Sequence, residues 1–129
     1  MPPSRQTLPP RLSDTVDTVN DIHQWVTTAN GFDGYKVVKP LGLVRGITVR
    51  SRSAIGSFGA NIQTIFGGNI TLYTELAEQS RAEAYEIMIR HAAALGANAI
   101  VACRYDTNEI SDGVAEVLCY GTAVQIAPI

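Results

Sequence analysis

The last third of the chain constrains the fold most strongly, because it predicts a β-hairpin with apolar residues on both faces. Two alternating stretches, residues 98–110 and 114–126, flank Ser111-Asp112-Gly113, a hairpin-turn sequence. In the second stretch one face carries Val117, Cys119 and Ala123, and the other carries Leu118, Tyr120, Val124 and Ile126. Since neither face is polar, both faces of the sheet need a cover. We expect a neighbouring subunit to cover the face that helices leave open.

The rest of the chain completes an α+β pattern. Residues 35–49 indicate a strand with apolar side chains on both faces, and Pro40, Gly42 and Gly46 predict that it is bent, bulged or partly at a sheet edge. A shorter alternation at residues 21–28 predicts another strand. We therefore expect an antiparallel sheet of three to four strands, packed against one short and one long helix.

Two helices are predicted between the strands. Apolar residues at helical spacing favour a short helix over residues 53–66 and a long helix over residues 71–95. Gly96 stands where a left-handed C-terminal cap would end the long helix. The expected buried stripe of the long helix consists of Leu76, Ala77, Ala84, Met88, Ala92 and Leu95.

The first twenty residues differ in composition from the rest. They hold four of the six prolines and few large apolar side chains, which is typical of a flexible or extended arm. We therefore divide the chain into an arm, residues 1–20, and one α+β domain, residues 21–129. The arm sequence TLPPRL is either an unstructured tail or a polyproline segment that docks onto a protein partner.

Composition excludes several classes of protein. A chain of 129 residues with 46% apolar and 17% charged residues is typical of one globular domain. Ten basic against twelve acidic residues provide no field for nucleic acid or an anionic membrane. The N-terminus has no apolar leader core and the chain has no membrane-length apolar run. Two isolated cysteines do not form a disulfide framework, so we expect a cytoplasmic protein with free thiols.

Four segments together resemble a known family. They are GYKVVKPLGLVRGITVRS, GGNITLYTEL, ALGANAIVACRYD and YGTAV, which occur in this order between Gly34 and Ile126. The chain is similar in these segments to the YbjQ-like family, which is named for heavy-metal binding and whose function is unknown. The resemblance implies a small α+β fold and a ring-shaped homopentamer in which the sheets of neighbouring subunits assemble. It implies nothing about the proline-rich arm.

The metal ligands that the family name suggests are sparse in this sequence. Soft divalent ions favour closely spaced cysteine and histidine pairs, whereas this chain offers only Cys103, Cys119, His23 and His91. Both cysteines are interpreted first as small core residues and only second as metal ligands. A two-residue turn at Asp112-Gly113 would place them on opposite faces of the hairpin, and a turn longer by one residue would place them on one face but offset. Neither register favours a disulfide or a two-cysteine site within one subunit, while a ring could still gather identical thiols around its axis.

Four charged residues are the candidates for a ligand site. Arg50 and Arg52 precede the predicted short helix, whose N-terminus would attract phosphate or carboxylate. Arg104 and Asp106 alternate away from Cys103 and share the sheet face opposite the core. The alternative interpretation is that these residues are solvated or form ion pairs with a neighbouring subunit.

No catalytic motif accompanies these residues. The chain has no GxSxG sequence, and a cysteine–histidine pair would lack an evident third group. No cofactor is identifiable, although a metal ion remains compatible with the residues. We therefore favour a ring-forming homo-oligomer that binds a small ligand or metal ion at subunit interfaces over an enzyme. The alternative is an oligomeric scaffold that displays the arm, residues 1–20, to a protein partner without a small ligand.

Overall fold

The protein is described by a computed structural model over residues 18–51 and 70–129. The predicted short helix, residues 53–66, and arm residues 1–17 lie outside the described residues. The described elements, in chain order, are α1 (Thr18–Ile22), β1 (Tyr35–Ser51), α3 (Ile70–Ala94), β2 (Ala99–Ser111) and β3 (Val114–Pro128).

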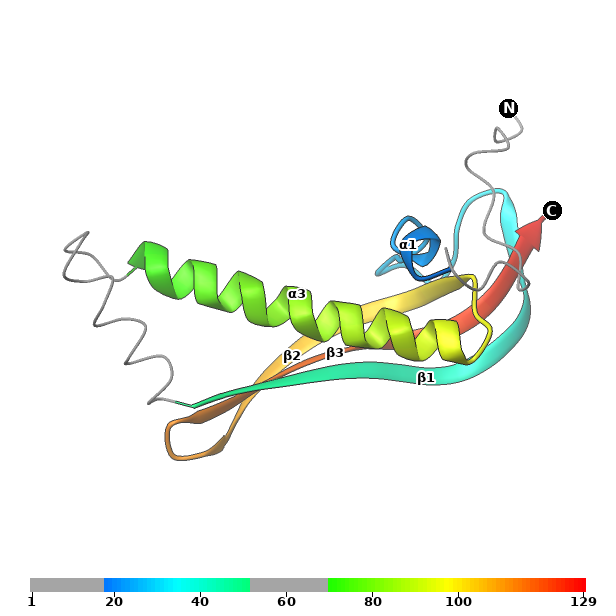
Figure 1. Cartoon of the computed structure of the whole chain (residues 1–129). Coiled ribbons are helices and arrows are strands. Elements are labelled where there is room, and N and C mark those ends of the chain that lie inside the picture. Colours follow the sequence, from blue (N-terminus) through cyan, green and yellow to red (C-terminus); the bar gives the residue numbers. More distant parts are fainter. Residues whose placement is uncertain (1–17, 52–69) are drawn as a thin grey trace.

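The three strands form one antiparallel sheet in the order β1-β3-β2, and α3 lies along one of its faces (Figure 1). The closing hairpin makes the turn that the sequence predicts, because Ser111 pairs with Val114 and Asp112-Gly113 connects them. Gly113 has a φ of 73°, a value that glycine adopts without strain. The predicted α+β class and antiparallel sheet are therefore confirmed.

The prediction of a strand at residues 21–28 is wrong. Asp21 and Ile22 belong to α1, and the backbone then turns, with the Trp25 N–H donating to the Ile22 carbonyl at 2.8 Å. Only Val26 makes a bridge, a parallel one, to Ile100 of β2. The apolar residues of this stretch contact different clusters rather than one sheet face, because Ile22 and Val26 pack under α3 whereas Trp25 packs on the other side of the sheet.

Strand β1 is irregular at the predicted place. Its register with β3 shifts between Val37 and Lys39 and again between Pro40 and Gly42, and Gly42 has a φ of 109°. As the first strand in the sheet order, β1 lies at an edge. Pro40, which has no N–H to donate, is tolerated there. The predicted bend, bulge and edge position are confirmed.

Helix α3 matches the predicted long helix within one residue at each end. Gly96 adopts a φ of 83°, and the Ala97 N–H donates to the Ala92 carbonyl at 3.1 Å, so the predicted glycine cap is confirmed. The buried stripe is displaced from the prediction, because Ala77 is exposed and Leu95 is 42% exposed. The side chains that pack inward are Ser80, Ala84, Met88, Ile89 and Ala92.

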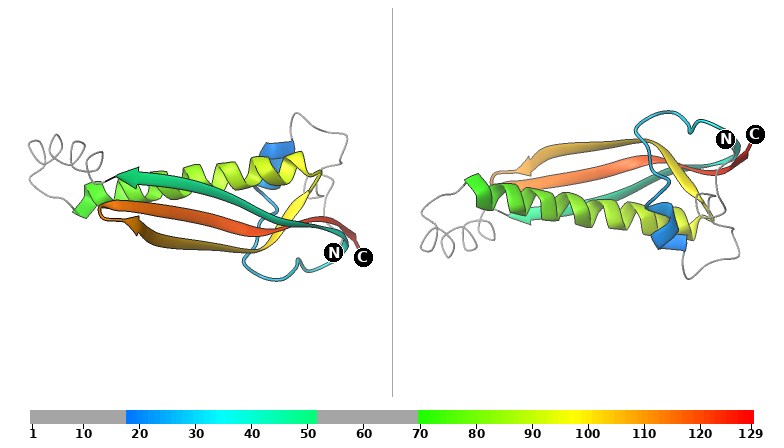
Figure 2. Two further views of the ribbon diagram at one scale, coloured as in Figure 1. Left: turned by 90° about the horizontal axis from the view of Figure 1, so that it is seen from below. Right: turned by 90° about the horizontal axis from the view of Figure 1, so that it is seen from above.

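Two apolar clusters lie on opposite faces of the sheet. The larger cluster fills the space between α3 and the sheet and includes Met88, Ile100 and Cys119. The smaller cluster lies at one end of the other face, where Trp25 and Phe32 cover residues near the ends of β2 and β3. No helix of the described part of the chain covers the rest of that face (Figure 2, left), where Leu43 is 60%, Ile47 42% and Val49 49% exposed. We call this surface the open face.

Asn98 joins the end of α3 to β3, and we expect its replacement to be costly. Its side-chain amide donates to the Ile126 carbonyl at 3.0 Å, and its amide oxygen accepts from the Ile126 N–H at 2.8 Å. Asn98→Ala leaves both buried backbone groups without partners, so we expect a loss of about 2–4 kcal/mol in the free energy of unfolding. Urea unfolding monitored by circular dichroism measures it. The exposed Asn20→Ala serves as control, and an equal effect of the two would contradict the prediction.

Candidate functional site

The site begins with a β-bulge in β2. Ala102 and Cys103 together oppose Gly121 of β3, and Ala102 has a φ of 55°, which is unusual for a residue with a side chain. Residues 27–29 hold the bulge, because the N–H groups of Ala102 and Cys103 donate to the carbonyls of Ala29 and Thr27 at 2.8 and 2.9 Å. A Cβ at Gly121 would lie 2.7 Å from the Ile100 side chain, so the bulge requires glycine opposite it.

The bulge and a second register shift, between Glu109 and Ser111, bring the two cysteines together. Cys119 pairs with Tyr105, and Cys103 is its diagonal neighbour on the face beneath α3. The two Sγ atoms are 3.8 Å apart, and the Sδ of Met88 lies 3.6 Å from the Sγ of Cys119. Both cysteines are free thiols. We call Cys103, Cys119 and Met88 the sulfur cluster.

The cysteines take the second of the two arrangements considered from sequence, on one face and offset along the strands. The inference that this offset disfavours a close pair is wrong. A two-residue turn does form, but the extra residue at Ile110 shifts the register by one and turns both cysteines to the same face. Their diagonal offset does not separate the thiols, because diagonal side chains reach one another across a strand pair. The bulge also places Val101 on the face opposite Cys103, whereas simple alternation had placed them together.

The two thiols have unlike acidities. The hydrogen bond from Cys119 lowers the pKa of Cys103 to about 7, against the opposing effect of burial and with help from the positive charge of Arg104. The pKa of Cys119 is raised, because this thiol donates that hydrogen bond and is buried. The pair therefore tends to hold one proton near neutral pH, with Cys103 as the thiolate.

Two tyrosines adjoin the sulfur cluster, because Tyr105 pairs in register with Cys119 and Tyr85 packs against the apolar cluster that contains both thiols. Burial raises the pKa values of Tyr85 and Tyr105, and the negative charge of the cysteines raises them further. Both tyrosines line a depression of about 470 Å³ between α3 and β2, together with Glu78, Arg81 and Ala82. It exists because α3 lies mainly over β1 and leaves the helix side of β2 uncovered (Figure 2, right).

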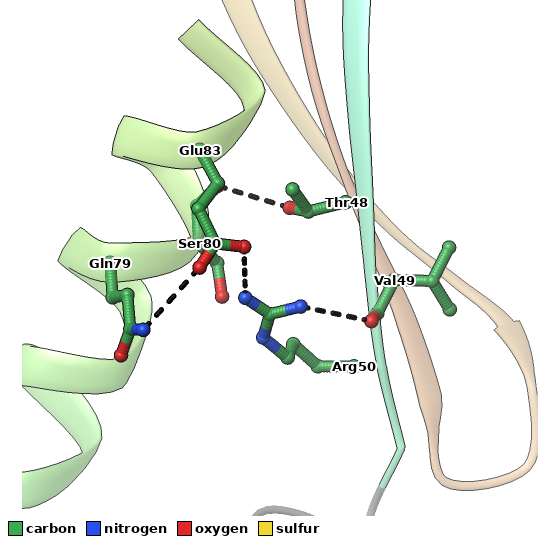
Figure 3. A network of polar contacts seen from close by, with 6 residues as sticks. All are labelled: Thr48, Val49, Arg50, Gln79, Ser80 and Glu83. Atoms are coloured by element: carbon green, nitrogen blue, oxygen red, sulfur yellow. Dashed lines mark hydrogen bonds and ion pairs between the residues drawn. The ribbon is translucent and has the colours of Figure 1, made fainter. Parts of the chain in front are cut away.

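Arg50 contacts its own chain. Its guanidinium forms an ion pair with Glu83 of α3 and donates to the Val49 carbonyl at 3.3 Å (Figure 3). Beside it the Thr48 hydroxyl donates to the Ser80 carbonyl at 3.0 Å. These contacts attach the end of β1 to α3. The second predicted arginine, Arg52, lies outside the described residues.

Arg104 and Asp106 share the open face, as their alternation predicts. The Arg104 guanidinium donates to the carbonyls of Thr28 and Cys103 at 2.7 and 2.9 Å, so it fastens residues 27–29 onto the bulge. Asp106 is exposed and pairs in register with Leu118. Arg104 therefore stabilises the bulge within its own chain, whereas Asp106 lies on the surface.

Arg45 is a charged residue of the open face that was not among the predicted site residues. It pairs in register with Tyr120, whose partner on the other side is Arg104. The alternation of β1 with Leu43 and Ile47 would have indicated this position.

The contacts of the two histidines are with residues other than the two cysteines. His23 forms an ion pair with Glu86 at 2.7 Å, and its ring lies 5.3 Å from the tilted ring of Tyr85. The Nδ1 of His91 accepts the Arg45 N–H at 3.4 Å. In residues 18–51 and 70–129, no three histidine, cysteine, aspartate or glutamate side chains gather as a metal site.

Neither described helix has the length and apolar character that a membrane crossing requires.

Comparison with known proteins identifies the family. Residues 24–127 match a family model described as "Putative heavy-metal-binding". A UPF0145 protein of Burkholderia cenocepacia is 62% identical over 102 residues, which cover 79% of this chain and 84% of that protein. A UPF0145 protein of Burkholderia thailandensis is 61% identical over 102 residues, 79% of this chain and 92% of that one.

A solved structure shares the fold. It is a protein of unknown function of the DUF74 family from Pediococcus pentosaceus, with a TM-score of 0.50 and 20% identity, covering 80% of this chain and 97% of that chain. The family match spans most of the described domain, and the relatives align over most of their own length. The chain therefore belongs to the YbjQ-like, UPF0145 family, as its sequence segments indicated.

Proposed function

We propose that this chain assembles into a homopentameric ring and binds a small ligand or metal ion at its subunit interfaces. The observation that carries the proposal is the open face. There Leu43, Ile47 and Val49, which share one face of strand β1, are between 42% and 60% exposed. An exposed apolar strip of this kind, which on β1 is interrupted by Arg45, marks a protein interface more often than a solvated surface. The subunit number follows from the family resemblance.

The sheet edges favour a ring over a two-fold dimer. The first half of β2 is bonded to residues 25–29, whereas the outer edge of β1 has no strand partner in the described part of the chain. The two edges are therefore unlike, and contact between unlike edges is heterologous. Heterologous contacts that close give rings. In this ring the open faces turn toward the axis, where neighbouring copies shield their apolar side chains.

The ligand site is proposed where charged groups border the apolar strip. Asp106 lies across Leu118 from Ile47, and Arg45 lies across Tyr120 from Arg104. Repetition around a ring would multiply each group, so that carboxylates of several copies face a cation or guanidinium groups face an anion. Arg50 is a weaker candidate because Glu83 already neutralises it.

Native mass spectrometry of the protein as isolated, without chelator, tests this proposal. We expect a five-fold multiple of the chain mass with a reproducible extra mass, which identifies the ligand. A clean five-fold multiple would support the ring but overturn interface ligand binding in favour of a scaffold that displays residues 1–20. Deleting those residues would then abolish capture of a protein partner. A single-chain mass at micromolar concentration would overturn the ring itself.

A further inference from the structure

We propose that the sulfur cluster is a binding site, within one subunit, for a soft monovalent cation such as Cu(I) or Ag(I). Cys103 and Cys119 would supply two thiolates and Met88 a thioether. Soft ions of this kind select sulfur ligands, and the site would be a three-sulfur, near-planar one.

The two sulfur–sulfur distances that involve Cys119 fit such an ion. For metal–sulfur bonds of about 2.3 Å, three sulfurs around a planar centre stand about 4 Å apart. The Cys103 and Cys119 sulfurs are 3.8 Å apart, and Met88 is 3.6 Å from Cys119. A small opening of the cluster would therefore admit the ion. The bulge holds Cys103 in this position, because the N–H groups of Cys103 and Ala102 donate to the carbonyls of Thr27 and Ala29.

The number and type of ligands favour a monovalent over a divalent ion. A zinc ion needs four ligands in tetrahedral arrangement, and the described residues provide no group of three or more His, Cys, Asp or Glu side chains. Met88 contributes a soft, neutral ligand that a hard cation would not favour. All three residues are at most 5% exposed, so an ion held there would be shielded from water.

The charge balance also suits a monovalent ion. Binding of M⁺ to two thiols forms two metal–sulfur bonds from thiolates and releases two protons to solvent, with no change of oxidation state. The bound unit carries one negative charge, which the guanidinium of Arg104 beside Cys103 would offset.

The depression between α3 and β2 offers the access route. Tyr85 and Tyr105 line it; Tyr105 pairs in register with Cys119, and Tyr85 packs against the apolar cluster that contains both cysteines, so the depression lies beside the sulfurs. Because the site needs residues of only one copy, it does not depend on the proposed ring or on the interface ligand.

The test is an anaerobic titration of the full chain with Cu(I), in competition with a chromophoric Cu(I) chelator, and a parallel titration with Ag(I). We expect one ion per chain, ultraviolet thiolate-to-metal charge-transfer absorption, and release of protons that lowers affinity as pH falls from 8 to 6. X-ray absorption of the copper-loaded wild-type chain should show sulfur neighbours only. Nitrogen or oxygen neighbours, or fewer than one ion per two chains, would overturn the site.

Variants separate the ligands from general packing. Cys103→Ala and Cys119→Ala should each weaken binding by at least about 100-fold, and Met88→Leu, which keeps the volume, by about 10-fold. Val117→Ala, which removes a buried side chain from the same face of β3, should bind as the wild type does. Unchanged binding by both cysteine variants would overturn the site, and unchanged binding by Met88→Leu would remove the thioether from it.

Discussion

Gly46→Ala is expected to lower the free energy of unfolding by more than about 3 kcal/mol. A Cβ at position 46 would lie 1.9 Å from the carbonyl oxygen of Ala84 and 2.7 Å from the backbone nitrogen of Met88. Both atoms belong to the backbone of α3, so no side chain can rotate away. The helix must move off β1 to admit the methyl group, and the packing of Met88 is lost with it.

Urea unfolding at one fixed protein concentration measures this effect, since assembly would otherwise change the apparent stability. Gly31→Ala is the matched control. A Cβ at Gly31 meets nothing within 4 Å, and the backbone there is not in the left-handed region, so we expect a change within about 0.5 kcal/mol. A stable Gly46→Ala chain with an unshifted midpoint would show that α3 does not approach β1 as closely as described.

The elements that could be predicted from sequence are those with local signals. Asp112-Gly113 predicts the hairpin turn because glycine adopts positive φ without cost, and the same property at Gly96 predicts the end of α3. The apolar content of both sheet faces predicts the open face. These features need no knowledge of distant contacts, which is why they are confirmed.

The sulfur cluster could not be predicted because it depends on contacts far apart in the sequence. The bulge that turns Cys103 toward Cys119 is held by residues 27–29 and needs Gly121 opposite it. Residues 21–28 themselves were predicted as a strand. Their apolar residues alternate in the sequence as they would in a strand, although they belong to a helix end, a turn and a single bridge. A register argument that assumes a regular ladder fails wherever a tertiary contact inserts a residue.

Ile47→Glu is expected to dissociate the proposed ring, with a rise of about 1,000-fold or more in the dissociation constant. Ile47 lies on the open face, where it pairs in register with Leu118 and is followed on the same face of β1 by Val49. The substitution is repeated in every copy, so several carboxylates would be brought toward one axis and removed from water. Their mutual repulsion and lost hydration would both oppose assembly.

Native mass spectrometry and light scattering measure the outcome, and Leu95→Glu is the control. Leu95 is 42% exposed, as Ile47 is, but it follows α3 on the covered side of the sheet, so the same change there should leave the assembly intact. A ring that survives Ile47→Glu would show that the open face is not the interface. The dissociated chain should still bind one Cu(I), because the sulfur cluster lies within a single subunit. Assembly and ion binding can therefore fail separately. If Ile47→Glu lost both, the thiols would need a neighbouring copy to bind the ion. That result would contradict a site within one subunit, while the proposal of a ring in the wild-type protein would stand.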